Sequence, residues 1–297
     1  MDRPQALVRR AVAAAETVAR EVGLRCTEPV VLSARGNAVV HLAPAPVVAR
    51  VSTLTAWTRR DPAAWLRREV AVAATAAANG GPVVPPTDLA HPGPYLAGGL
   101  SLTLWRHVTV SPERAPAPAA GEALAALHDA LQHHAEPLPR LTVVHDLVTE
   151  GLAALHRHRA VDAAVLNGLR RVHAEILRDL PANAGPAIVL HGDAHPGNLL
   201  RVGDRWLWTD LEETCTGPRA WDLAVLSNQS GSPADGAAAV LAYAAAAGVP
   251  VPTPQDLAPF VRARHLEGTV WVLGMAHQYP DRYAGIADGM LRLVLQS

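Results

Sequence analysis

The chain has 297 residues, of which 49% are hydrophobic and 18% charged, so it is long and apolar enough to bury a substantial core and is not a disordered chain. All 26 basic residues are arginines, which excludes any mechanism that needs a lysine side chain, and the 27 acidic residues leave a formal net charge of −1, which argues against a nucleic-acid-binding protein. Two cysteines exclude a disulfide scaffold, and an amphipathic N-terminal helix is unlike a signal peptide. We therefore expect a cytoplasmic protein that does not enter a membrane.

The first third of the chain is predicted to be rich in β-strands. A helix is expected over residues 5–22, where small and aliphatic residues recur at helical spacing. A second helix begins at Asp61-Pro62, with Asp61 as its N-cap, and ends at Asn79-Gly80-Gly81. The apolar, β-branched runs predict four strands, at residues 30–32, 38–42, 47–51 and 100–105.

The remainder of the chain is predicted to be mostly helical. Helices are expected over residues 119–134, 142–158 and 161–180, and from residue 221 to the end with a break at 248–254. Short strands are expected at residues 187–190, 199–202 and 205–209. The change from a strand-rich to a helix-rich sequence falls near residues 105–110. We therefore expect an α+β protein with two lobes, residues 1–105 and 106–297.

The densest group of polar residues lies around residues 191–198 and 210. A buried strand leads into His191-Gly192-Asp193, and Asn198 precedes a hairpin that turns at Gly203-Asp204 and ends at Asp210. This turn brings Asn198 and Asp210 together near Asp193. A carboxylate that deprotonates a hydroxyl, beside amide and carboxylate oxygens that bind Mg²⁺, suits phosphoryl transfer.

Two other interpretations of this cluster remain open. Asp and Asn residues often only cap loops, so the group at residues 191–198, or the one around Asp210, could be structural if it is considered alone. His191 and His195 are four residues apart with Asp193 between them, which on a helix would suit zinc and a metallohydrolase. Because Pro196 and Gly197 follow directly, a continuing helix is disfavoured here.

Three ordered motifs resemble the aminoglycoside phosphotransferase/choline-kinase-like family of small-molecule kinases. They are His191-Gly-Asp193-x4-Asn198, Asp210-Leu-Glu212 and Gly217-Pro218-x3-Asp222-Leu223-Ala224. The resemblance implies a two-lobed protein-kinase-like fold, with a β-rich N-terminal lobe that has one main helix and a helical C-terminal lobe. It also implies the role of each motif residue: Asp193 as catalytic base, Asn198 and Asp210 as Mg²⁺ ligands, His191 as a brace of the loop and Asp222 as its anchor.

The same resemblance implies where the nucleotide, ATP or GTP, would bind in the first lobe. Arg50 occupies the position of the usual lysine on the third strand, and Glu69 on the following helix would be its partner. As an alternative, Arg50 and Glu69 form only a surface ion pair of little consequence. The resemblance further implies that Ser33, Gly36 and Asn37 belong to the loop over the phosphates. It places the hinge that binds the adenine near Trp105 and His107.

The acceptor is expected to be a small molecule with a hydroxyl group, and several residues are candidates for binding it. A cationic acceptor would favour a ring of carboxylates. The candidates are Glu212, Glu213, His265, Glu267 and Trp271.

The favoured function is phosphorylation of an antibiotic or other natural product, for resistance or biosynthesis. The alternatives are a metabolic kinase for an amino alcohol or a sugar, and a nucleotide-binding pseudokinase that regulates a partner. The sequence gives no oligomeric state.

Overall fold

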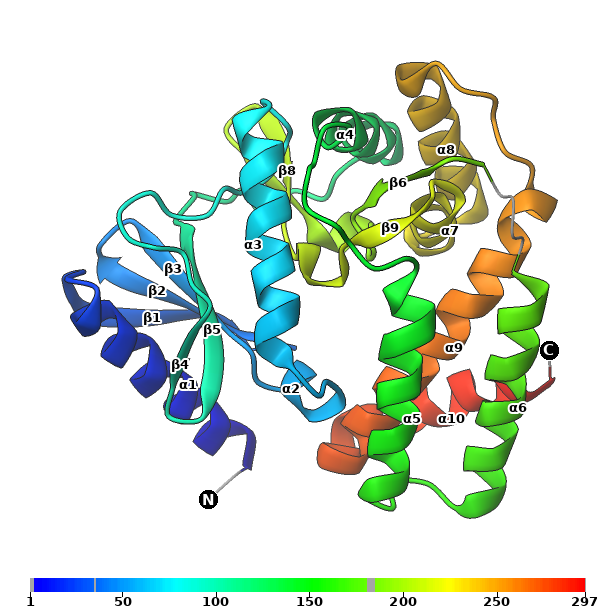
Figure 1. The fold of residues 1–297 in the computed structure, drawn as a ribbon, viewed down its shortest axis with the longest axis horizontal. Helices are drawn as coiled ribbons and strands as arrows, with labels where there is room; N and C mark the ends of the chain where they lie inside the picture. The colour runs from blue at the N-terminus through cyan, green and yellow to red at the C-terminus, as the bar shows by residue number, and fades with distance from the viewer. Residues whose placement is uncertain (1–2, 35, 181–184, 297) are drawn as a thin grey trace.

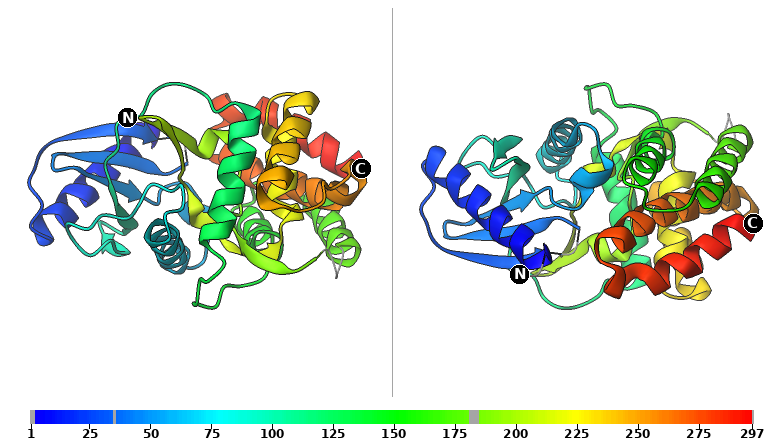
Figure 2. Two further views of the ribbon diagram at one scale, coloured as in Figure 1. Left: turned by 90° about the horizontal axis from the view of Figure 1, so that it is seen from above. Right: turned by 90° about the horizontal axis from the view of Figure 1, so that it is seen from below.

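The protein is described here from a computed structural model, which covers residues 3–34, 36–180 and 185–296. One antiparallel sheet with its helices forms one end of the molecule, and a group of helices forms the other (Figure 1). Views from above and below show the same elongated arrangement (Figure 2). The α+β architecture expected from the sequence is therefore confirmed.

The five-stranded sheet is built from the first third of the chain. Its order is β1-β2-β3-β5-β4, and all neighbouring strands are antiparallel. The strands are β1 Cys26–Ala34, β2 Ala38–Pro44, β3 Val47–Val51, β4 Tyr95–Ala97 and β5 Leu100–Arg106. Helix α1, Arg3–Glu21, packs its buried alanines and Val18 on one face of this sheet.

The alternation of side chains along β3 decides what each face of the sheet carries. Val47, Ala49 and Val51 point into the core formed with α1. Val48 and Arg50 therefore point to the opposite face. There Val48 packs with residues of helix α3, Pro62–Ala78, which begins at the predicted Asp61 cap. Strand alternation thus turns Arg50 toward the space beside α3.

The second part of the chain is mostly helical, as predicted. Its helices are α4 Ala117–Ala130, α5 Val148–Arg157, α6 Ala163–Asp179, α7 Ala220–Gln229, α8 Pro233–Ala247, α9 Pro254–Gln278 and α10 Pro280–Gln296. Two small two-stranded antiparallel sheets pair β6 Ala187–Leu190 with β9 Cys215–Pro218, and β7 Leu199–Val202 with β8 Arg205–Trp208. The largest hydrophobic core lies among these helices and also includes residues of α3.

Short elements account for most differences from the predicted elements. Helix α2, Thr55–Thr58, and strands β4 and β9 are not signalled by the sequence, because three or four residues carry too little periodicity. The helix predicted over residues 142–158 begins with a π-helical turn, Val143–Leu147. No helix in the described ranges is long and apolar enough to span a membrane.

Candidate active site

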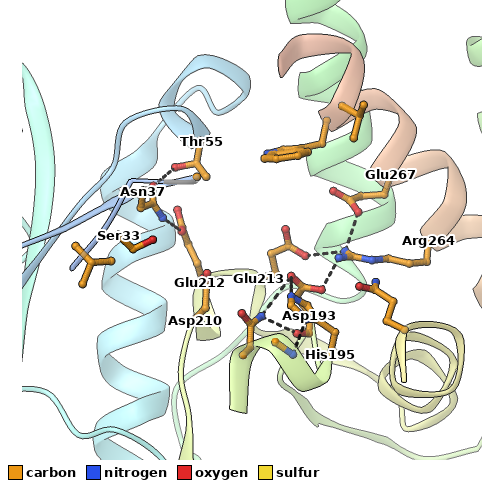
Figure 3. A pocket seen from close by; sticks show the side chains of 18 of the residues that line it. Ser33, Asn37, Thr55, Asp193, His195, Asp210, Glu212, Glu213, Arg264 and Glu267 are labelled. Carbon is orange, nitrogen blue, oxygen red and sulfur yellow. Dashed lines mark hydrogen bonds and ion pairs between the residues drawn. The ribbon is translucent and has the colours of Figure 1, made fainter. Parts of the chain in front are cut away.

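A cavity of about 970 Å³ lies between the sheet and the helical part. Ser33, Asn37 and Thr55 approach it from the sheet side, whereas Arg264 and Glu267 approach from α9 on the opposite side (Figure 3). Asp193, Asp210, Glu212 and Glu213 lie between these two groups. The cavity therefore gathers most of the residues that the sequence singled out.

The loop after β6 is anchored by Asp222, which lies fully buried in α7. Its two carboxylate oxygens accept hydrogen bonds from the backbone N–H groups of His191, at 2.8 Å, and Gly192, at 3.0 Å. The Trp221 indole also donates to the Gly192 carbonyl, at 2.7 Å. Gly192 has φ +91°, and a Cβ there would lie 2.1 Å from the Glu213 carbonyl oxygen, so only glycine fits. These contacts fix the backbone that carries Asp193.

His191 is fully buried, and its two ring nitrogens form hydrogen bonds, one within this loop and one to the segment after β8. Its Nδ1 accepts from the Asp193 backbone N–H, at 3.3 Å, so its Nε2 carries the proton and donates to the Thr209 carbonyl, at 3.1 Å. Burial lowers the pKa of His191, which favours this neutral form, although Asp222 opposes the shift. With both nitrogens engaged, His191 is poorly placed to bind zinc. Among the described residues, no group of three His, Cys, Asp or Glu side chains could hold a metal ion.

The neutral, buried state of His191 predicts a dependence of stability on pH. The pKa of His191 is lower in the folded than in the unfolded chain, where it is about 6.5, so acid protonates the unfolded chain first. The stabilisation is thus complete above about pH 6.5 and is lost as the pH falls below it. In urea unfolding from about pH 7 to 5.5, we expect the wild type to lose more stability than His191→Asn. Parallel losses would contradict this role.

The β7–β8 hairpin brings Asn198 and Asp210 to its open end, as predicted. Leu199 pairs with Trp208 and Val202 with Arg205, which leaves a two-residue turn at Gly203-Asp204. The Thr209 N–H donates to the Asn198 carbonyl, at 2.9 Å, and Asp210 has a left-handed backbone with φ +63°. Both side chains line the cavity together with Asp193.

The oxygen atoms of this group fit a magnesium ion held together with nucleotide phosphates. The Asn198 side-chain nitrogen donates to the Asp193 backbone carbonyl, at 3.0 Å, and the described residues supply no donor to its side-chain oxygen. The Asp210 side chain is 43% exposed to the cavity. Mg²⁺ is commonly bound through one or two such protein oxygens, with water and phosphate as the other ligands.

Arg50 contacts the predicted Glu69, but also two acidic residues that the sequence did not connect with it. Its Nη1 lies 2.6 Å from both Glu69 carboxylate oxygens, and its Nη2 donates to Asp210 and, at 2.6 Å, to Glu212. The Arg50 side chain is 8% exposed and that of Glu69 is 1% exposed, so the pair is not a surface ion pair. Burial raises the pKa of Glu69 to about 7, although Arg50 opposes this shift. Arg50 therefore joins β3, α3 and the segment after β8.

Glu212 is engaged mainly by the sheet side of the cavity. Besides Arg50, its carboxylate accepts from the Asn37 side chain, at 2.7 Å, and contacts Arg59, which follows α2. Arg59 is buried and stacks on the Trp65 ring, 4.4 Å from its centroid. Through these contacts Glu212 joins the two parts of the molecule. This role fits its contacts better than the predicted contact with an acceptor does.

The other residues predicted to bind nucleotide divide into two groups. Ser33, Gly36 and Asn37, at the tip of the β1–β2 hairpin, line the cavity; Arg35 lies outside the described residues. Trp105 instead packs between β3 and α3, and its indole donates to Thr103, at 2.8 Å. His107 stacks on His41, with the ring centroids 3.8 Å apart. The backbone N–H of His107 already donates to the Pro46 carbonyl.

The predicted acceptor residues lie on the helical side of the cavity, apart from Glu212. Glu267 is buried and Glu213 is partly buried, and both contact Arg264, as does Asp193. The His265 ring pairs with the Asn228 side chain, at 3.1 Å, and Trp271 lines the wall nearby. Burial raises the pKa of Glu267, whereas burial and Glu267 raise that of Glu213 well above its ordinary value.

Three residues in or beside this site carried no signal in the sequence. They are Arg59 and Arg264, described above, and the buried His128 of α4, which bridges Asp222 and Tyr243, both at 2.9 Å. Their partners are far away in the chain; Arg264, for example, is 71 residues from Asp193. Only the position of His128 on the apolar face of its helix could have indicated a buried, hydrogen-bonded imidazole.

A family model for the phosphotransferase enzyme family, APH, matches residues 37–260, which is most of the chain. The match includes Arg50, Asp193, Asn198 and Asp210, whereas the cavity residues of α9 lie beyond it. The chain belongs to this family. It is therefore a phosphotransferase, as the motifs around Asp193 and Asp210 suggested, and the metallohydrolase interpretation is set aside. No curated protein matches this APH-family chain.

Solved structures of small-molecule kinases share the fold of this APH-family protein at low sequence identity. A choline/ethanolamine kinase family protein from Mesorhizobium loti has a TM-score of 0.61 at 18% identity, and covers 99% of this chain and 95% of its own. Amicoumacin kinase hAmiN, in complex with AMP-PNP, Ca²⁺ and Ami, has a TM-score of 0.70 at 11% identity, covering 97% of this chain and 95% of its own. A thermostable mutant of aminoglycoside phosphotransferase APH(4)-Ia, in ternary complex with ADP and hygromycin B, has a TM-score of 0.57 at 13% identity, covering 95% of this chain and 97% of its own. The kinase-like fold predicted from the sequence is thus confirmed.

Proposed function

We propose that this APH-family protein transfers the γ-phosphate of ATP or GTP to a hydroxyl group of an antibiotic or other natural product, in resistance or biosynthesis. The observation that carries the proposal is the meeting of Asp193, Asn198 and Asp210 in one cavity with Arg50. The lobes are residues 1–105, for the nucleotide, and 106–297, for catalysis and the acceptor.

In this proposal Asp193 is the catalytic base. Burial alone would raise its pKa, but the Arg264 guanidinium holds the pKa of Asp193 below its usual value, so it is ionised at neutral pH. It orients the acceptor hydroxyl and takes its proton. The hydroxyl oxygen then forms a bond to the γ-phosphorus, the bond from that phosphorus to the β–γ bridging oxygen breaks, and the nucleoside diphosphate leaves.

Asn198 and Asp210 would hold Mg²⁺, which neutralises charge on the nucleotide phosphates when it is bound. Replacing Asp210 by asparagine is expected to weaken Mg²⁺-dependent nucleotide binding at least about tenfold, because an anionic ligand is lost. The change can be measured by calorimetry with AMP-PNP at several Mg²⁺ concentrations. Asp204→Asn, at the exposed tip of the same hairpin, is the matched control. Unchanged Mg²⁺ dependence in Asp210→Asn would remove Asp210 from the metal site.

The decisive experiment is a mass-spectrometric screen of hydroxyl compounds with ATP and with GTP. A mass gain of one phosphate on an acceptor, dependent on Asp193, would establish the reaction and the preferred nucleotide. The screen includes amino alcohols and sugars, because a metabolic kinase would phosphorylate these instead of natural products. Nucleotide binding with no transfer to any acceptor, and no hydrolysis, would favour the pseudokinase with a regulatory partner.

A further inference from the structure

Three carboxylates meet at the acceptor side of the cavity and form what we term the acidic cluster, namely Asp193, Glu213 and Glu267. They come from three separate elements: the loop after β6, the 3₁₀ turn Leu211–Glu213 and helix α9. Their side chains are 19%, 14% and 5% exposed. Carboxylates buried this far and this close together are costly unless a cation lies among them.

Arg264 supplies that cation from within the chain. Its Nη1 lies 2.7 Å from Glu267 and 3.3 Å from Glu213, and its Nη2 contacts Asp193 (Figure 3). The side chain is only 12% exposed. Both terminal nitrogens of the guanidinium are thus engaged, and one guanidinium touches all three members of the acidic cluster. The position from which a ligand ammonium group could contact all three carboxylates is already filled.

Building on the proposed function, we propose that Arg264 determines acceptor specificity. Because its guanidinium already lies among the carboxylates, it limits the acceptor to neutral or singly charged hydroxyl compounds and excludes polycations. A second cation at the acidic cluster would meet the Arg264 charge at close range, or would have to displace a side chain held by three ion pairs. Either route is unfavourable, and such a repulsive element is a common source of specificity.

The remaining acceptor-side walls agree with this limit. Trp271, Val272 and Met290 give an apolar surface, and Asn228 and Gln229 offer uncharged polar groups. A second arginine, Arg282, lines the same side of the cavity. The acceptor side therefore carries three carboxylates and two guanidinium groups, with apolar and amide surface between them. Such a surface suits an uncharged, oxygen-rich compound with an apolar face better than a polyamine.

The proposal can be tested with spermidine, a linear triamine small enough that its size does not exclude it from the cavity. Spermidine is titrated calorimetrically into the protein without nucleotide. We expect the wild type to bind it weakly, and Arg264→Gln, which empties the position, to bind it at least about tenfold more tightly. Arg264→Lys keeps a cation in the cluster and should bind spermidine as weakly as the wild type.

The matched control is Arg262→Gln, two residues earlier on α9. Arg262 forms ion pairs with Glu175 and Asp179 of α6, away from the cavity, and its loss should leave spermidine binding at the wild-type level. Removing Arg264 alone could prevent folding, because it takes the shared cation away from the buried Glu267 and the partly buried Asp193 and Glu213. The double variant Arg264→Gln/Glu267→Gln removes one charge of each sign and should also bind spermidine more tightly than the wild type.

Equal spermidine affinities in the wild type and in the folded variants that carry glutamine at position 264 would overturn the proposal, since Arg264 would then give way to a ligand cation. Tight binding by the wild type would overturn it as well. A separate titration with Mg²⁺ and AMP-PNP tests the proposed kinase function. Loss of nucleotide binding would therefore be recognised independently of the result with spermidine.

Discussion

Replacing Asp193 by asparagine is expected to lower kcat by about 10²–10⁴-fold, the usual contribution of a general base. The asparagine side chain can still accept a hydrogen bond from the acceptor hydroxyl but cannot take its proton. The Kd for nucleotide should barely change, because Asp193 is assigned to the acceptor. Folding should survive, since Arg264 retains Glu213 and Glu267 as partners.

The measurement is steady-state kinetics with an acceptor from the screen, together with calorimetry for the nucleotide. Asp204→Asn introduces the same change at an exposed position and should leave kcat at the wild-type value. A kcat for Asp193→Asn within a few-fold of the wild type would remove Asp193 from the mechanism.

Replacing Arg50 by alanine is expected to lower kcat/KM for the nucleotide by more than about 100-fold, with a higher KM and a lower kcat, because the phosphates lose both binding and alignment. The variant also leaves Glu69, Asp210 and Glu212 without their shared cation, which costs about 3–5 kcal/mol of stability for a buried pair. Arg50→Lys is therefore the more informative change. A single ammonium group cannot reproduce contacts made by two separate guanidinium nitrogens, so it should restore only part of the activity.

A double-mutant cycle tests whether Arg50 and Glu69 act as one unit. Glu69→Ala should resemble a weaker form of Arg50→Ala, and the combined variant should lose less than the sum of the two. Arg106→Lys on the neighbouring strand, where Arg106 pairs with Asp88 in an exposed ion pair, is the matched control. Fully additive losses, or unchanged nucleotide kinetics in Arg50→Ala, would show that another group holds the phosphates.

Much of the fold was predictable because its signals are local. Asp61 and Pro62 start α3 as the sequence indicated, and the side chain of Asp61 accepts from the Ala64 N–H. Gly203-Asp204 turns the β7–β8 hairpin, and that turn alone is enough to bring Asn198 beside Asp210. Elements of three or four residues, such as β4 and α2, are fixed by their neighbours in the folded chain and leave no pattern of their own.

The contacts among charged residues were less predictable, because they depend on how distant segments pack. The pairing of Arg50 with Glu69 was expected, but Arg50 also contacts Asp210, 160 residues away. Glu212 was predicted only as a candidate for binding the acceptor, and the sequence did not indicate that its carboxylate contacts Asn37, Arg50 and Arg59. The spacing of charged residues along a chain does not predict which arginine will form an ion pair with which carboxylate.

Helix α3 packs against both ends of the molecule, and this has a consequence for how the chain unfolds. Its Ala73 lies against Val48 and Trp105 of the sheet, whereas Trp65 and Val72 belong to the large core among the C-terminal helices. Neither end can melt without exposing a face of this helix, so heat should unfold the chain in one cooperative transition rather than lobe by lobe. A compound that binds anywhere in the cavity then raises that single melting temperature, which makes thermal shift a direct way to find acceptors.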